Sequence, residues 1–327
     1  MNNKKFPIES AGRKMIKAVP LCYQEERILD VKKMLFEKIK EIETVNYIYV
    51  IDKEKKLLGV FSIKEIFRKP EGTKVKEIMD RRIIKVRPRT DQEKVAILAL
   101  KNNLKSIPVV DKEDKFLGVV PSDIILDILH SENVEDFLKA AGIHSPFKKL
   151  LNGSPLFLVK VRIPWLILGL LGGIFAAQII GFFETPLMSY FILAAFIPLI
   201  LYTASAVGAQ TETLFIRSLV LDSRLEVKKY LLREIKASFL MALILGGLLF
   251  LISIFWFSSS YYIGIILGIS LFLTILMAIL IGIFIPWSLQ KFKKDPAVGT
   301  GPFATIIRDI LSLVIYFSVA YFLLKFF

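Results

Sequence analysis

The pattern of apolar and polar residues changes character near residue 150. Up to about that point charged residues interrupt the apolar ones every few positions, as in a domain that folds in water. From about residue 156 onward Leu, Ile, Phe, Ala and Gly form long runs. The pattern predicts a multidomain chain, with a soluble α+β part followed by an all-α membrane part.

Five apolar runs are long enough to cross about 30 Å of hydrocarbon as helices. They cover Ile163–Phe182, Leu187–Val207, Leu231–Phe257, Tyr261–Trp287 and Phe303–Phe326. Lys and Arg gather before the first run, between the second and third, and after the fourth. Because basic residues mark the cytosolic side, we expect a multi-pass protein of the cell membrane with its N-terminus inside and its C-terminus outside.

Composition adds three constraints. The chain of 327 residues is 54% hydrophobic, which is too apolar for an ordinary soluble enzyme. Its net charge of +14 is largely explained by the basic membrane loops, and no basic stripe with interleaved aromatics points to nucleic acid. A single cysteine, Cys22, excludes an intramolecular disulfide, and the start "MNNKKFPIES" has no apolar signal segment, so the soluble part is expected in the cytosol.

An internal repeat organises the soluble part. "YIYVIDKEKKLLGVFSIKEIF" (47–67) aligns with "SIPVVDKEDKFLGVVPSDIIL" (106–126). Each copy predicts strand, turn, strand and helix, and each follows an upstream strand ("MIKAVPL", "IIKV") and an amphipathic helix. This β-α-β-β-α order, twice, resembles a pair of cystathionine-β-synthase (CBS) domains, which are regulatory modules. Two unrelated small α/β units are the alternative.

An ordered set of motifs in the apolar part resembles one family, the MgtE magnesium channels. The motifs are "RIPWL" (162–166), "FIPLI" (196–200), "VGAQTETLFIRSL" (207–219), "LLREI" (231–235) and "DPAVGTGPFATIIRDILSLVIYF" (295–317). The resemblance implies a homodimer in membrane lipid that takes up Mg²⁺. It implies a tail over residues 1–13, CBS domains over 14–70 and 71–130, a connecting helix over 131–160, and a five-helix transmembrane bundle over 161–327.

The chain departs from the family pattern in two places. Family members commonly begin with an acidic helical domain, whereas about a dozen residues precede the first repeat here, so weaker feedback by Mg²⁺ is expected. The family segment Gly-Gly-Asn-x-Gly-x-Gln reads "ASAVGAQ" (204–210), which leaves ion selectivity open. Glu212 either compensates for the missing Asn or lies at the cytosolic interface, and we favour the interface.

Two adjacent charges, Arg308 and Asp309, interrupt the fifth apolar run. Charge at that depth costs at least a few kcal/mol, so a task is expected for it. Neighbouring helix residues point about 100° apart, so the two need not neutralise each other. The resemblance implies that Asp309 lines a pore at the dimer axis, assisted by Thr305, while Asp295 at the mouth is either a ligand or a helix-start residue. Arg308 is expected to extend to the cytosolic interface, and a mutually neutralising pair is the alternative.

Acidic residues of the soluble part are candidate sensors of Mg²⁺. They are Asp91 and Glu93 in "TDQEKV", and Asp127, Glu132, Glu135 and Asp136 in "LDILHSENVEDF". Like charges four residues apart on a helix repel unless a cation bridges them. The resemblance implies that bound Mg²⁺ draws these acids together and closes the pore, whereas an ordinary solvated helix face is the alternative.

A nucleotide site is a second implication of the CBS resemblance. Tyr47, Lys64 and Glu65 stand where the family contacts ATP, and Asp123 stands where many CBS copies hold a ribose. Lys64 can supply charge to a phosphate but not the bidentate contact of an Arg. ATP or another adenine nucleotide is therefore expected, with ordinary surface residues as an equal alternative.

Other classes fit less well. A zinc metalloprotease needs His-Glu-x-x-His, but the two histidines, His130 and His144, lie outside the spans, so we expect no enzyme. A membrane scaffold does not explain Asp309. An ion-coupled carrier of Mn²⁺, Co²⁺ or Zn²⁺ uses the same residues and stays open beside a Mg²⁺ channel.

Overall fold

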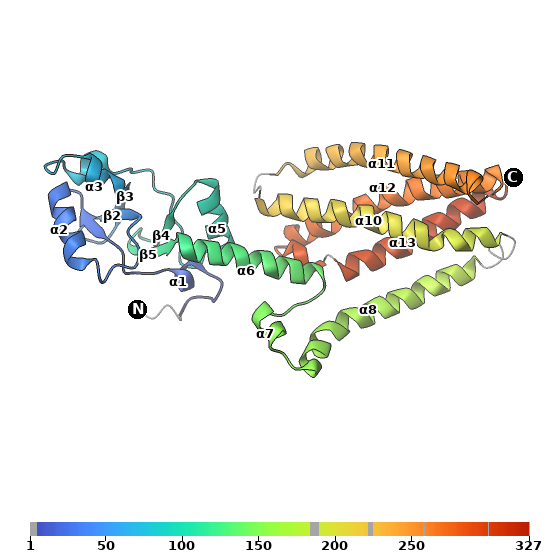
Figure 1. The fold of residues 1–327 in the computed structure, drawn as a ribbon, viewed down its shortest axis with the longest axis horizontal. Coiled ribbons are helices and arrows are strands. Elements are labelled where there is room, and N and C mark those ends of the chain that lie inside the picture. The colour runs from blue at the N-terminus through green and yellow to red at the C-terminus, as the bar shows by residue number, and fades with distance from the viewer. Residues whose placement is uncertain (1–4, 184–189, 222–224, 258, 300, 327) are drawn as a thin grey trace. The chain divides into compact units, whose positions relative to one another are not determined.

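The computed structural model describes residues 5–183, 190–221, 225–257, 259–299 and 301–326 (Figure 1). The chain divides into two compact units, Met1–Asn133 and Val134–Phe327. The first unit contains the strands and the second is helical, as the change of pattern near residue 150 predicts. Each unit has its own buried core.

The first copy of the repeat builds a three-stranded sheet. Strands β1 (Leu21–Tyr23) and β2 (Tyr47–Ile51) are parallel, and β3 (Leu57–Ser62) runs antiparallel to β2. Helix α2 (Ile28–Lys38) packs its apolar face on this sheet through Ile28, Val31 and Leu35. The short helices α3 (Lys64–Arg68) and α4 (Val75–Ile78) follow the sheet.

The second copy has the same order with a shorter sheet. Helix α5 (Gln92–Lys101) precedes the antiparallel strands β4 (Ser106–Val110) and β5 (Phe116–Pro121), and α6 (Ser122–Ala140) follows them. The strand predicted at "IIKV" is reduced to one bridge, between Val86 and Val109. Pro88 comes two residues later and has no N–H to continue a ladder, which explains the early end.

The start of the chain contributes to the second copy. Helix α1 (Ala11–Lys14) places Ala11 in the core that contains Val95 and Ile107, and Ile16 forms a bridge with Val119. The strand predicted over "MIKAVPL" therefore forms later, at β1, because Ile16 is already paired with the other copy. The two copies are interlocked by this exchange.

The stretch predicted as one connecting helix over 131–160 is helical in three pieces. Helix α6 ends at Ala140, and Gly142 then adopts a left-handed φ of 73° that turns the chain. Helix α7 (Phe147–Leu151) is short, and α8 (Pro155–Phe182) starts behind a Ser154 cap. The first membrane helix is thus longer than its predicted apolar core.

Five helices of the described residues are long and apolar enough to cross a membrane, which confirms the five predicted spans. They are α8, α10 (Phe191–Leu221), α11 (Val227–Phe255), α12 (Tyr261–Lys291) and α13 (Pro302–Leu323). The predicted start of the second span, 187–189, lies outside the described residues. Helix α12 is central and packs against α10, α11 and α13, while α8 lies against α13.

Two close approaches at glycine position the last helix. A Cβ on Gly301, whose φ is 70°, would overlap the carbonyl oxygen of Ala140 at the end of α6. A Cβ on Gly142 would lie 3.0 Å from the ring of Pro302. Because glycine alone fits at such contacts, the start of α13 lies directly against the turn that follows α6.

Candidate functional site

The polar residues of the fifth span occupy one side of α13. Thr305, Arg308, Asp309 and Ser312 follow each other at helical spacing, and Arg308 and Ser312 are buried. Arg308 and Asp309 find different partners, both on α10. The expectation that the adjacent charges do not simply neutralise each other is therefore supported by their contacts.

Arg308 forms a buried ion pair with Glu212. Arg308 is 2% exposed, and its Nη1 donates to Glu212 Oε2 at 2.8 Å. Nη2 donates to the Thr305 hydroxyl at 3.2 Å. The prediction that Arg308 extends to the cytosolic interface is wrong, because the guanidinium finds its counter-charge inside the bundle.

Glu212 is buried between the helices. It is 3% exposed, and its carboxylate compensates the charge of Arg308, while its depth in the membrane stays a prediction. An unpaired charge buried among apolar helices costs several kcal/mol, which is why two charged residues from different helices meet here.

Asp309 lies beside this pair but is bonded to a hydroxyl. Ser205 Oγ donates to Asp309 Oδ1 at 2.6 Å, and the Asp309 side chain stays partly exposed. Among the described residues no Lys, Arg or His forms an ion pair with Asp309. The four side chains of Arg308, Glu212, Asp309 and Ser205 thus carry a formal net charge of −1.

The partners on α10 share one face of that helix. Ser205, Gly208 and Glu212 are spaced i, i+3 and i+7, which aligns them toward α13. A Cβ on Gly208 would meet Arg308 Cδ at 2.6 Å and the carbonyl oxygen of Ala278 on α12 at 3.1 Å. The glycine provides the space through which the arginine stem passes.

A further buried acid, Glu234 on α11, escaped the sequence analysis. It is 8% exposed and accepts a hydrogen bond from Thr211 on α10 at 3.2 Å. In the sequence Glu234 is the acid inside "LLREI". Its basic neighbours make the segment look like an exposed, charged helix start, so the burial of Glu234 was not expected. Adjacent residues of α10, Thr211 and Glu212, therefore connect to α11 and α13 respectively.

Asp295 precedes α13 and has two partners. Its Oδ1 accepts from the amide of Ala297 at the start of the short helix η2 (Pro296–Gly299). Its Oδ2 lies 2.6 Å from Lys139 Nζ, which also contacts Glu135 Oε1 at 2.7 Å. Asp295 thus has the contacts of a helix-start residue, and an ammonium occupies the space between the two acids.

Electrostatics at the end of α6 follow from these contacts. Burial raises the pKa of Asp136, and the negative charge of Asp295 raises it further. Burial alone lowers the pKa of Lys139, but hydrogen bonds to Asp295 and Glu135 outweigh it and raise that pKa. Asp136 therefore takes up a proton more readily than an exposed aspartate does.

The predicted sensor acids of the soluble part have separate partners. Asp91 caps α5 by accepting from the amides of Glu93 and Lys94, and Glu132 accepts from Gln92 Nε2 at 2.5 Å. Asp127 is exposed on α6. In the part of the chain that the structure describes, no three His, Cys, Asp or Glu side chains converge as metal ligands. Binding of Mg²⁺ by these acids stays a prediction.

The predicted nucleotide residues lie in the first unit. Tyr47 begins β2 opposite Ser62, and its hydroxyl accepts from the amide of Lys105 at 3.4 Å. Lys64 and Asp123 are exposed, whereas Glu65 is engaged by Arg68 at 3.3 Å. Nucleotide binding at these residues stays a prediction as well.

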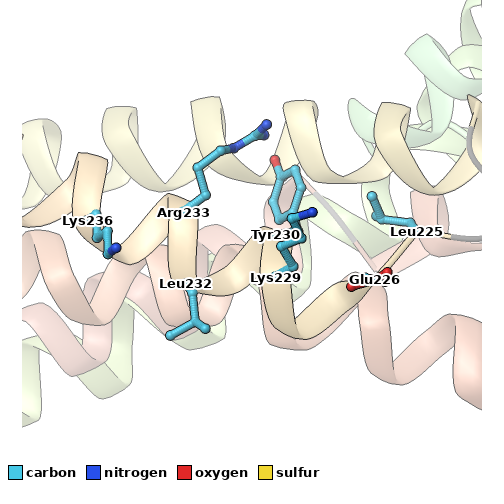
Figure 2. A pocket seen from close by; sticks show the side chains of 7 residues that line it. All are labelled: Leu225, Glu226, Lys229, Tyr230, Leu232, Arg233 and Lys236. Carbon is cyan, nitrogen blue, oxygen red and sulfur yellow. The ribbon is translucent and has the colours of Figure 1, made fainter.

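A groove of about 620 Å³ at the start of α11 is lined mainly by basic side chains, in contrast to the acidic residues above (Figure 2). Arg233 stacks over the ring of Tyr230 there, 5.0 Å from its centre. Three bases and one acid line the groove, so it does not suit a cation. Its lining residues are Leu225, Glu226, Lys229, Tyr230, Leu232, Arg233 and Lys236.

A repeated α/β unit joined to a five-helix bundle with charges buried between its helices defines a multi-pass membrane protein. Residues 197–319 match the MgtE family, described as divalent cation transporters, and residues 10–72 and 75–131 each match the CBS domain. The chain belongs to the MgtE family, whose members are transporters and not enzymes.

Relatives cover nearly the whole chain. The magnesium transporter MgtE of Bacillus subtilis is 32% identical over 318 residues, which are 96% of this chain and 70% of the relative. The MgtE of Thermus thermophilus is 32% identical over 324 residues, or 98% and 71%. The solved cytosolic domain of a Mg²⁺ channel MgtE in complex with ATP is 32% identical, with a TM-score of 0.38, over 38% of this chain and 51% of that one.

Proposed function

We propose that this protein imports Mg²⁺ across the cell membrane along a path that passes Asp309. The observation that carries the proposal is the partly exposed Asp309 carboxylate on α13, which is held by Ser205 and is not paired with a base among the described residues. The names of the relatives, magnesium transporters, supply the ion.

The chemistry of the site suits this ion. Mg²⁺ prefers oxygen ligands, dehydrates reluctantly and keeps several waters when one or two carboxylates bind it. A serine hydroxyl and a carboxylate can hold a hydrated cation through its waters. Thr305, predicted as a helper of Asp309, accepts a hydrogen bond from Arg308, and its help at the cation path stays part of the proposal.

A homodimer completes the proposal. One chain offers one Asp309, and a lone carboxylate is a poor site for a divalent cation, whereas two copies at a dimer axis double the charge. The orientation with the CBS domains in the cytosol and the C-terminus outside follows from the basic loops.

Regulation by cytosolic Mg²⁺ is the finer part of the proposal. Lys139 already bridges Asp295 and Glu135, with Asp136 half-buried nearby. A regulatory cation bound here by one or two carboxylates has to displace that ammonium. Nucleotide binding near Tyr47 is a separate expectation on which the transport proposal does not depend.

Replacement of Asp309 by Asn tests the proposed path. We expect Asp309→Asn to lower Mg²⁺ uptake into liposomes at least about tenfold, because the charge at the site is lost while the volume is kept. Uptake is followed with an enclosed Mg²⁺ dye. Glu226→Gln, which removes an exposed acid at the start of α11, is the matched control and should transport normally.

The same preparation separates the two transport classes. Large unitary currents in planar bilayers support a channel, and uptake that requires a proton or sodium gradient supports a coupled carrier. Full uptake by Asp309→Asn contradicts the proposed path, and preference for Mn²⁺, Co²⁺ or Zn²⁺ over Mg²⁺ contradicts the proposed ion.

A further inference from the structure

The ion pair of Arg308 and Glu212 adjoins the proposed cation path. Arg308 is the residue before Asp309 on α13, and Glu212 lies seven residues after Ser205 on α10. Each contact joins α10 to α13, and the two α13 members, Arg308 and Asp309, are adjacent residues. A guanidinium next to a cation path repels the cation unless another group neutralises its positive charge.

We propose that Glu212 sets the charge of the transport path: it neutralises Arg308 and holds its guanidinium away from Asp309. The inference rests on the proposed function, since it assigns a role relative to a cation at Asp309. Glu212 and Arg308 are positioning residues in this view, because the guanidinium pairs with Glu212 and the Asp309 carboxylate is bonded to Ser205.

The geometry constrains the guanidinium at three points. Its stem crosses α10 at Gly208, where a Cβ would lie 2.6 Å from Arg308 Cδ. Nη1 donates to Glu212 and Nη2 to Thr305, so both ends of the planar fork are engaged. Thr305 lies one turn before Arg308 on α13, so this bond holds Nη2 toward the start of the helix.

Arg308 and Glu212 have opposite effects on an entering cation. Charges separated by a few ångströms interact strongly where helices exclude water. If Glu212 loses its charge, the guanidinium is left positive beside Asp309 and repels an entering cation. If Arg308 loses its charge, Glu212 adds a second negative charge to the same region and attracts the cation.

Opposite shifts in apparent affinity test the proposal. In reconstituted full-length protein we expect Glu212→Gln to raise the KM for Mg²⁺ uptake about tenfold and Arg308→Gln to lower it about threefold. The double variant E212Q/R308Q carries neither charge, and its KM should return to within about threefold of the parent value. A merely structural role makes both single variants fail in the same way.

Folding is checked alongside transport. Breaking a buried pair by removing one partner is strongly destabilising, whereas removing both leaves no unpaired charge. Elution as a single species in detergent and the unfolding temperature are therefore measured for each variant. If Glu212→Gln does not fold, Arg308→Gln and the double variant still decide the sign.

Two results overturn the inference: a KM that moves in the same direction in both single variants, or a KM that is unchanged in folded Glu212→Gln. Failure of the proposed function looks different, because then the parent takes up no Mg²⁺ or Asp309→Asn keeps full uptake. An inactive Asp309→Asn together with same-direction shifts rejects the charge-setting role alone.

Discussion

Asp91 in the soluble unit and the buried carboxylates among the membrane helices have different kinds of partner. Asp91 binds the backbone of its own helix at an exposed position. Glu212 and Glu234 are buried, and each is bonded to a side chain of another helix. Water satisfies an exposed acid wherever it lies, whereas a buried acid requires a specific partner. An acid in an apolar run is therefore more informative about tertiary structure than an acid on a soluble helix.

The largest expected effect comes from filling the space beside the buried pair. Gly208→Val places a side chain against Arg308 Cδ and the Ala278 carbonyl. We expect a loss of folding stability of about 3–5 kcal/mol, because the ion pair must break or the helices must separate. The measurement is the yield of a single species by size exclusion together with its unfolding temperature.

A glycine of α11 provides the matched control. A Cβ on Gly247 meets nothing within 4 Å, so Gly247→Val should cost much less. Equal behaviour of the two variants would show that the approach of α10 to Arg308 is not tight, and the contrast between buried and exposed acids would lose its main support.

Replacement of Lys139 should change Mg²⁺ binding by an intermediate amount. Lys139→Met removes the ammonium between Asp295 and Glu135 and leaves their charges next to Asp136. We expect about tenfold tighter apparent binding of Mg²⁺, seen as a larger rise of the unfolding temperature at millimolar Mg²⁺. Lys228→Met, at an exposed lysine of α11, is the control.

An unchanged response of Lys139→Met to Mg²⁺ would place the regulatory ion elsewhere. It would also mean that the acids at the end of α6 behave like those of the soluble unit, as solvated groups.

Asp91 should give the smallest effect. Asp91→Ala removes the cap of α5 and should cost about 1 kcal/mol, whereas Asp91→Asn keeps a capping oxygen and should cost little. Hydrogen exchange of the α5 amides in the full chain reports the difference. If Asp91→Asn instead abolishes inhibition by Mg²⁺ with α5 intact, Asp91 is a metal ligand and the comparison of the two regions must be revised.

Local patterns predicted most of the fold. Run length gave the five spans, and the repeated "DKE" turn gave the paired α/β copies. The predictions were wrong where the interacting residues are distant in sequence. The bridge of Ile16 with Val119 removed one predicted strand, and the pairing of Arg308 with Glu212 spans 96 residues. Asp309 stood out because of the apolar residues around it, but Ser205 looks ordinary until α10 is placed against α13.

The contact at Gly301 has a mechanical consequence. The backbone at the end of α6 lies against the backbone at the start of α13, with Gly142 and Pro302 touching beside it. Long side chains can absorb a displacement by changing rotamer, but backbone in direct contact has no such compliance. A shift of the last turn of α6 therefore has to move the start of α13 or open this contact. Asp309 lies about two turns further along α13. The contact between Ala140 and Gly301 therefore connects the end of α6 mechanically to the proposed path.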